Sequence, residues 1–263
     1  MADYITVDNL DEIVEQNKKI SIAVEEELFF LLHQYNQDGR IKSEEKLAFN
    51  ILKKHGLIQI PLENRHWGGA IYFVNDKRIP VINTALPRVN QYFVAWHELY
   101  HLLCEKTWKD KVYEVSVELS IQERKADYFA AKALMGNVYQ YYMELKKEDF
   151  LDNIALCMDL YQVPYKAILI QLYEESKAYK DYKLQEIIKR YFDLRNINWK
   201  ERFQKLGLDQ ELVEASNVFY LGYLEEKIAE KLTSEPEVSA HELNKRYLDS
   251  LKEKVKILLC SKE

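Results

Sequence analysis

The segment from His97 to His101, with the sequence HELYH, constrains the local fold more than any other part of this 263-residue chain. Side chains four positions apart on an α-helix lie nearly one above the other, about 40° apart around the axis. On a helix, His97 and His101 therefore point the same way and can reach one metal ion. Glu98 follows the first histidine directly, where its carboxylate can meet a metal-bound water. This spacing is typical of zinc hydrolases, in which one helical turn supplies two ligands and a general base.

The flanking sequence favours a helix at this position. Residues 89–106 contain neither proline nor glycine and are rich in apolar residues. The simpler alternative is a buried helix whose two histidines are satisfied by hydrogen bonds. The ligand spacing, the intervening Glu98 and the apolar neighbours together favour metal binding. Tyr100, next to the second histidine, is a candidate contact for the oxyanion or the substrate.

A catalytic zinc usually takes three protein ligands and leaves one position for water. Glu123 and Asp127 are the candidates for completing the site, because they lie four positions apart on one face of a second predicted helix. Glu123 would be the third ligand, and Asp127 would accept the N–H of a ligating histidine. The alternative is a solvated charged face in which both carboxylates pair with Arg124 or with lysines. The apolar run at 128–135 indicates a partly buried helix and favours the ligand interpretation.

A small sheet is predicted before the first helix of the site. Residues 57–61 read as a short strand, and residues 70–74 and 78–83 read as a hairpin. Pro80 predicts that its strand lies at the edge of the sheet or that its N–H position faces outward. An extended substrate could pair with such an edge, although a purely structural sheet is the alternative. Asn83, at the end of the hairpin, is a second candidate for oxyanion or substrate contact.

The rest of the chain reads as helical, so the predicted fold class is α+β and mostly α-helical. We expect three regions: an N-terminal helical segment (1–42), a metallopeptidase domain (43–175) and a helical C-terminal region (176–263). Residues 13–37 and 43–54 are predicted helices, the second capped by Ser43. The C-terminal region has the pattern of three or four helices.

Composition excludes several classes of function. The formal net charge is −6 and no long basic tract occurs, which argues against direct nucleic-acid binding. Apolar runs are too short to span a bilayer, and the N-terminus lacks the pattern of a secretory signal. Three widely spaced cysteines, Cys104, Cys157 and Cys260, form no paired motif. We therefore expect reduced thiols and a cytoplasmic protein.

Several segments resemble the ImmA/IrrE family of metallo-endopeptidases. The matching segments are residues 79–83, 95–101 and 123–135, with a weaker match at 154–164. The resemblance implies a zincin-like fold and one Zn²⁺ held by His97, His101 and Glu123, with Glu98 as the base and Asp127 in support. It also implies that the partner is a helix-turn-helix transcriptional repressor, cleaved as part of gene regulation in a mobile element or a stress response.

The chain departs from the family pattern at three positions. Tyr100, Lys125 and Gly136 stand where the family usually has glycine, glutamate and proline. None of these changes removes a predicted ligand. Two alternatives to a peptidase stay open at this point. One is a non-catalytic module that keeps the metal fold and regulates a repressor by association, and the other is a structural helical protein in which the motif is accidental.

Overall fold

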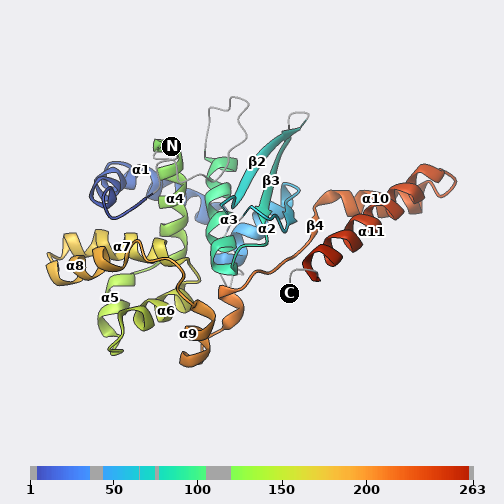
Figure 1. The fold of residues 1–263 in the computed structure, drawn as a ribbon. Coiled ribbons are helices and arrows are strands. Elements are labelled where there is room, and N and C mark those ends of the chain that lie inside the picture. The colour runs from blue at the N-terminus through green and yellow to red at the C-terminus, as the bar shows by residue number, and fades with distance from the viewer. Residues whose placement is uncertain (1–4, 36–43, 65, 75–76, 105–119, 261–263) are drawn as a thin grey trace.

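The computed structural model describes residues 5–35, 44–64, 66–74, 77–104 and 120–260, and these ranges form a mostly helical α+β fold (Figure 1). The predicted fold class is therefore confirmed at this level. Ser43, the predicted cap, lies outside the described residues, as do the hairpin turn 75–76 and residues 105–106 of a predicted helix. The helices are α1 (Leu10–Tyr35), α2 (Glu44–Lys54), α3 (Arg88–Leu103), α4 (Ile121–Leu134), α5 (Val138–Glu144), α6 (Phe150–Tyr161), α7 (Tyr165–Ala178), α8 (Tyr182–Tyr191), α9 (Trp199–Leu206), the 3₁₀ helix η1 (Gln210–Val213), α10 (Tyr223–Ser234) and α11 (Ser239–Cys260).

The sheet has four strands in the order β2-β3-β1-β4. Strands β2 (Gly69–Val74) and β3 (Lys77–Asn83) form the predicted antiparallel hairpin. Strand β1 (Ile58–Ile60) runs parallel to β3. The last strand, β4 (Tyr220–Leu221), was not predicted; it comes from the C-terminal region and pairs antiparallel with β1. The C-terminal region therefore contributes to the sheet.

The prediction that the Pro80 strand lies at the sheet edge is wrong for the strand as a whole. Strand β3 lies between β2 and β1, and the outer strand beside it is β2. Pro80 pairs with Ile71 on β2, whereas β1 pairs only with the stretch from Val81 to Asn83. Proline is accepted here because it precedes the part of β3 that has a neighbour on both sides.

Helix α3 lies in the middle of the molecule, with the sheet on one side and α4 on the other (Figure 1). Aromatic side chains fill the interface between the two helices, and the rings of Trp96 and Phe129 lie 5.9 Å apart. One hydrophobic cluster runs from Ile5, before α1, to Leu212 in η1. Helix α1 packs against α4 and α7 within this cluster. The site helix is therefore held by neighbours from distant parts of the sequence.

Helices α10 and α11 form a hairpin that projects from the rest of the molecule after β4 (Figure 1). Helix α10 has no fully buried side chain, and Leu248 is buried on α11. Leu243 and Tyr247 of α11 are exposed. Throughout the described residues, no helix combines the length and the apolar character that crossing a membrane requires.

Candidate metal centre

Helix α3 directs the predicted motif into the interior. His97, Glu98 and His101 are at most 3% exposed. The helix begins at Arg88, and Pro87 is its N-cap residue, where the missing N–H removes no hydrogen bond from the helix. Helix α3 is enclosed by the sheet and by α4, so even its polar motif residues face other protein elements. Buried polar groups of this kind need partners, and α4 supplies them for the two histidines.

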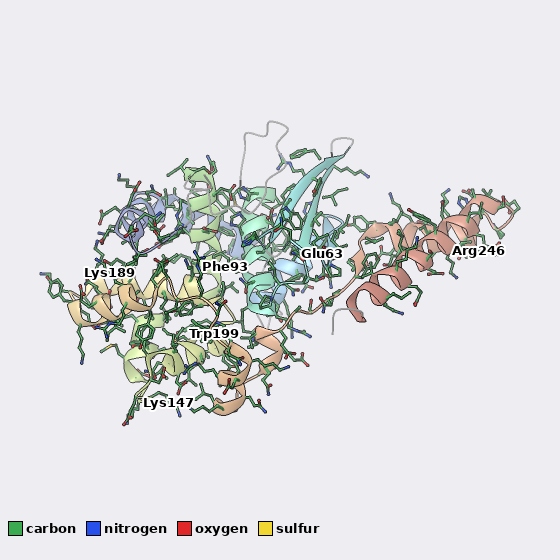
Figure 2. The ribbon with its side chains drawn as sticks, in the orientation of Figure 1. Glu63, Phe93, Lys147, Lys189, Trp199 and Arg246 are labelled. Carbon is green, nitrogen blue, oxygen red and sulfur yellow. The ribbon has the colours of Figure 1, made fainter. Side chains whose placement is uncertain are left out.

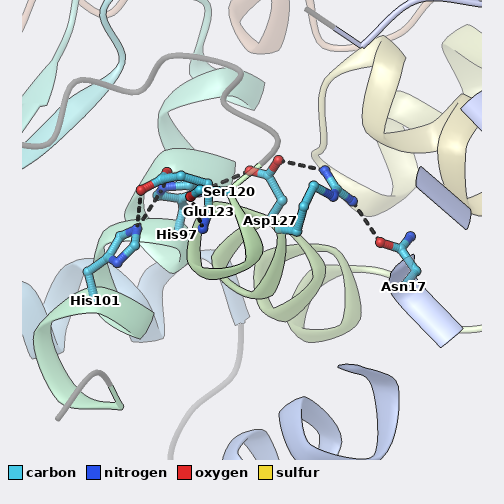
Figure 3. A network of polar contacts seen from close by, with 7 residues as sticks. Asn17, His97, His101, Ser120, Glu123 and Asp127 are labelled. Atoms are coloured by element: carbon cyan, nitrogen blue, oxygen red, sulfur yellow. Dashed lines mark hydrogen bonds and ion pairs between the residues drawn. The ribbon is translucent and has the colours of Figure 1, made fainter. Parts of the chain in front are cut away.

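Helix α4 brings Glu123 to the two histidines (Figure 3). The hydroxyl of Ser120 accepts the N–H of Glu123 at 3.3 Å, which caps the helix and places Glu123 in its first turn. Glu123 Oε2 lies 3.1 Å from His97 Nε2, and Glu123 Oε1 lies 3.5 Å from His101 Nε2. The two Nε2 atoms are 3.1 Å apart. The structure thus brings together all three residues predicted as metal ligands, each of them buried.

The donor atoms fit a metal ion. His97 Nδ1 lies 2.9 Å from a carboxylate oxygen of Asp127, so this nitrogen is the donor in the neutral ring. The Nε2 atom then carries a lone pair that faces the carboxylate of Glu123. Two acceptors at 3.1 Å need a cation between them, which is either a proton or a metal ion. Two imidazoles and one carboxylate form a common donor set of catalytic zinc sites.

A chain of hydrogen bonds continues outward from His97 (Figure 3). Asp127 Oδ2 accepts a hydrogen bond from Arg124 Nη1 at 2.9 Å. Arg124 Nη2 donates to Asn17 Oδ1 on α1 at 2.7 Å. The chain fixes the carboxylate of Asp127 and so the ring orientation of His97, a support that metal-binding histidines usually have. Pairing of Arg124 with Asp127 was the alternative interpretation from sequence, but Arg124 is buried and the pair is not a solvated surface contact.

Asn17 was missed by sequence reasoning. Ile13, Asn17, Ile20 and Val24 are all buried and follow one face of α1 at helical spacing. A lone amide in an apolar stripe is a detectable signal, because burying it unpaired would cost about 1–3 kcal/mol. The partner could not be read from the sequence, since Arg124 lies 107 positions away.

Burial and neighbouring charges shift the pKa values of the site in the metal-free protein. Burial raises the pKa of Glu98 to about 7, although the charges of His97 and His101 oppose this rise. Burial also acts to raise the pKa of Glu123, but its contacts with His101 and His97 outweigh this and hold the pKa at about 2. For His97, burial acts to lower the pKa, and the contacts with Asp127 and Glu123 raise it well above its usual value. The site therefore favours a cation beside Glu123.

Glu98 is the one member of the motif that lacks a polar partner. It is 0% exposed, and neither carboxylate oxygen has a hydrogen-bond partner among the described residues. Gly69, the first residue of β2, lies against it: a Cβ at this position would approach Glu98 Oε1 to 2.9 Å and Val94 Cγ1 to 2.7 Å. A glycine is therefore required where β2 passes Glu98.

Asn83 holds the loop that precedes β2. Its Oδ1 accepts the backbone N–H groups of Leu62 and Ala85 at 2.9 and 3.0 Å. Its Nδ2 donates to the carbonyls of Asn64 and Trp67 at 3.1 and 2.8 Å. Four backbone partners engage both ends of the amide, so the geometry gives Asn83 a structural task. Contact with an oxyanion or substrate stays a prediction for this residue.

Tyr100 is buried beside the site. Its ring lies 5.5 Å from that of Phe129 and 5.8 Å from that of His101, so it packs between α3 and α4. A substrate contact stays a prediction for Tyr100 as well. Cys104 does not join the histidine–glutamate group, and burial raises the pKa of its thiol to about 12. The Cys104 thiol therefore stays protonated at neutral pH, whereas the form that binds metal ions is the thiolate.

A cleft of about 910 Å³ opens beside the centre. Its lining includes Gly68, Val94, Arg124 and Asp127. Asp127 also contacts His97 at 2.9 Å, so a single side chain separates the cleft from a candidate ligand. A volume of this size is at the upper end of the range found for ligand sites in proteins.

We compared the chain with known protein families, curated proteins and solved structures. No protein-family model matches the chain, and neither a curated protein nor a solved structure matches it significantly. The resemblance to the ImmA/IrrE family therefore depends on the motif residues alone. The structure itself establishes a mostly helical α+β fold with a buried His97–His101–Glu123 group that can hold a metal ion.

Proposed function

We propose that this protein is a zinc-dependent endopeptidase with a zincin-like fold. One observation carries the proposal: His97, His101 and Glu123 converge in the interior, and the unpartnered carboxylate of Glu98 is next to His97 on the same helical turn. A buried carboxylate without a hydrogen-bond partner costs stability, so its presence calls for a functional reason. A general base beside a metal is such a reason.

His97, His101 and Glu123 would hold the ion, and Asp127 would keep the His97 ring in place. Zinc bound there would lower the pKa of a water molecule and polarise the scissile carbonyl. Glu98 would accept the proton of the attacking water and later deliver it to the leaving amine. In the metal-free protein the pKa of Glu98 is about 7, and a group that titrates near neutral pH can take up and release a proton.

Among the described strands, the free edge of the outer strand β2 is a place where an extended peptide substrate could pair. The strand has β3 on one side, and no strand within the described ranges pairs with its other side. An extended peptide can add to such an edge through backbone hydrogen bonds. Strand β2 starts at Gly69, which touches Glu98, so a peptide aligned there would pass the general base. The alternative, a purely structural sheet, leaves this edge without a substrate.

The substrate we propose is a helix-turn-helix transcriptional repressor. This part of the proposal is supported by the ImmA/IrrE-like motif residues, since members of that family resemble peptidases that act on such repressors. The protein would then regulate transcription by proteolysis.

The test combines metal content with cleavage of a candidate repressor. Glu98→Gln should keep zinc, measured by elemental mass spectrometry, and lose about 10²–10⁴-fold in cleavage rate, because the general base is gone. Glu186→Gln is the matched control, since Glu186 is exposed on α8, away from the site. A Glu98→Gln variant that cuts at the wild-type rate would refute the mechanism.

The second candidate is a non-catalytic module that binds a repressor. The projecting α10–α11 hairpin supports it, because Leu243 and Tyr247 expose apolar surface that a partner could cover. The same variant separates the two functions in a reporter assay for repressor activity. Loss of the effect in Glu98→Gln favours the peptidase, and an unchanged effect favours the binding module.

A further inference from the structure

The cleft beside the metal centre is built from parts of the chain that are far apart in sequence. One wall comes from the beginning of α3 and carries Leu86, Pro87 and Phe93. Another part of the lining comes from α7 and the segment around Trp199. Figure 2 shows Phe93 and Trp199 one above the other between these elements. The cleft is therefore lined by large apolar side chains from two distant parts of the chain.

Apolar walls of this kind select bulky apolar side chains. Phe93, Trp199 and Ile170 are only partly buried, so they have surface left to cover. Burying a leucine-sized side chain against such surface is worth about 1.5–3 kcal/mol. Asn90, also on the α3 wall, offers an amide that can hydrogen-bond to a peptide backbone. The lining suits a peptide better than a small polar metabolite.

The charges of the lining are unbalanced. Among its described residues, the one carboxylate is that of Asp127, which is already engaged by His97 and Arg124. Lys166 and Arg195 also line the cleft. Arg195 is exposed and forms no salt bridge to any described residue. The cleft therefore has cationic character that no lining carboxylate neutralises.

Contacts with neighbouring residues fix the position of the Lys166 side chain at the cleft. Its ammonium group donates to the carbonyl of Ile5 at 2.8 Å and lies 4.8 Å from the ring centre of Phe192. Asp193 is 3.6 Å away and offsets part of its charge. The side chain still keeps 46% of its surface exposed. Together with Arg195 it forms a cationic rim that can receive a carboxylate.

We propose that this cleft binds the part of the substrate next to the scissile bond and selects a segment with bulky apolar side chains and an acidic residue. The proposal rests on the peptidase function, because the cleft reaches the candidate centre through Asp127. It adds a substrate preference that the metal ligands alone do not define. Phe93 and Trp199 would set the apolar preference, and Lys166 and Arg195 the acidic one.

The test measures peptide binding rather than cleavage. Full-length protein carrying Glu98→Gln is titrated into fluorescein-labelled peptides, and fluorescence anisotropy gives the dissociation constants. Each peptide contains a pair of leucines and one glutamate, which is moved one position at a time along a set. Matched sets carry lysine in place of the glutamate or serine in place of the leucines. At the best position, glutamate should bind about fivefold more tightly than lysine, the size expected for exposed ion pairs.

Two variants assign the preference to the cleft. Arg195→Glu should abolish or reverse the glutamate preference, while Lys245→Glu on exposed α11 should leave it unchanged. Phe93→Ala should weaken leucine peptides about tenfold and serine peptides much less. Thermal unfolding checks that each variant is folded.

Three results would overturn the proposal: no binding of any peptide, equal binding of the glutamate and lysine sets, or a glutamate preference that survives Arg195→Glu. These outcomes differ from failure of the peptidase function. A protein that binds the predicted peptides but never cleaves them would refute the peptidase function alone. A protein that cleaves its substrate without the acidic preference would refute the proposal alone.

Discussion

Replacing Glu98 by glutamine should remove a pH-dependent loss of stability from the metal-free protein. Burial raises the pKa of Glu98 to about 7 in the folded chain, against 4.5 as the reference value. Below pH 4.5 the carboxyl group is protonated in both the folded and the unfolded state. As the pH rises toward 7, the folded state keeps a proton that the unfolded state has released. The free energy of unfolding therefore falls over this range.

The magnitude follows from the gap between the two pKa values. Each pH unit corresponds to about 1.36 kcal/mol, so the gap from 4.5 to about 7 amounts to about 3 kcal/mol. Glutamine cannot ionise and does not suffer this loss. Its buried amide introduces an unpaired polar group at a cost of about 1–3 kcal/mol, but this cost is the same at every pH. The prediction therefore concerns the pH dependence of the difference between variant and wild type.

The assay is urea unfolding followed by circular dichroism, in the presence of a chelator, at steps between pH 4 and pH 8. The free energy of unfolding of Glu98→Gln minus that of the wild type should rise by about 3 kcal/mol across the series. His97 and Glu123 titrate in both proteins, so their contributions largely cancel in the difference. Glu186→Gln on exposed α8 is the control. A difference that stays flat for Glu98→Gln would refute the argument that burial dominates at this site.

Two further substitutions test the surroundings of the centre. Arg124→Ala should weaken zinc binding about 10–100-fold in a chelator competition, because Asp127 loses the partner that orients it toward His97, and Arg124→Lys should recover part of the affinity. Equal affinities for wild type and Arg124→Ala would show that the chain of hydrogen bonds does not support the ligand. Gly69→Ala should lower the free energy of unfolding by about 1–3 kcal/mol in urea titrations and slow cleavage, because the added Cβ would meet Val94 Cγ1 at 2.7 Å and both Glu98 Oε1 and the Val81 carbonyl oxygen at 2.9 Å. Full stability with full activity would contradict the close packing of Gly69 against Val94, Glu98 and Val81.

The motif helix and its partner helix could be predicted from sequence because their signals are local. His97 and His101 must face the same way on any helix, and Glu123 and Asp127 likewise share a face. The hairpin was also readable, since its two apolar runs and the turn between them lie within about fifteen positions of one another. The convergence of α3 and α4 on one point was expected from the chemistry of zinc sites, and the distances now confirm it.

Other features depended on contacts between distant segments. Strand β4 has two residues, too few to show a period, and it forms because the chain returns to β1 from the C-terminal region. Pro80 was expected either in an edge strand or with its N–H position facing outward; the strand is not at the edge, because β1 pairs with β3 beyond Pro80. The pattern within β3 contains no information about which strands will lie beside it.

The sequence by itself determined which residues share a helical face, because a helical turn is set by local backbone geometry. Together with the residue types, this geometry defined His97, His101 and Glu123 as candidate metal ligands and Glu98 as the candidate base. Only the tertiary structure decided what surrounds them: Asn17 and Arg124 behind Asp127, Gly69 against Glu98, and a cationic cleft between α3 and α7. These arrangements depend on how α1, β2 and α7 pack around the two site helices. Such packing results from burial summed over the whole chain rather than from any short segment of it.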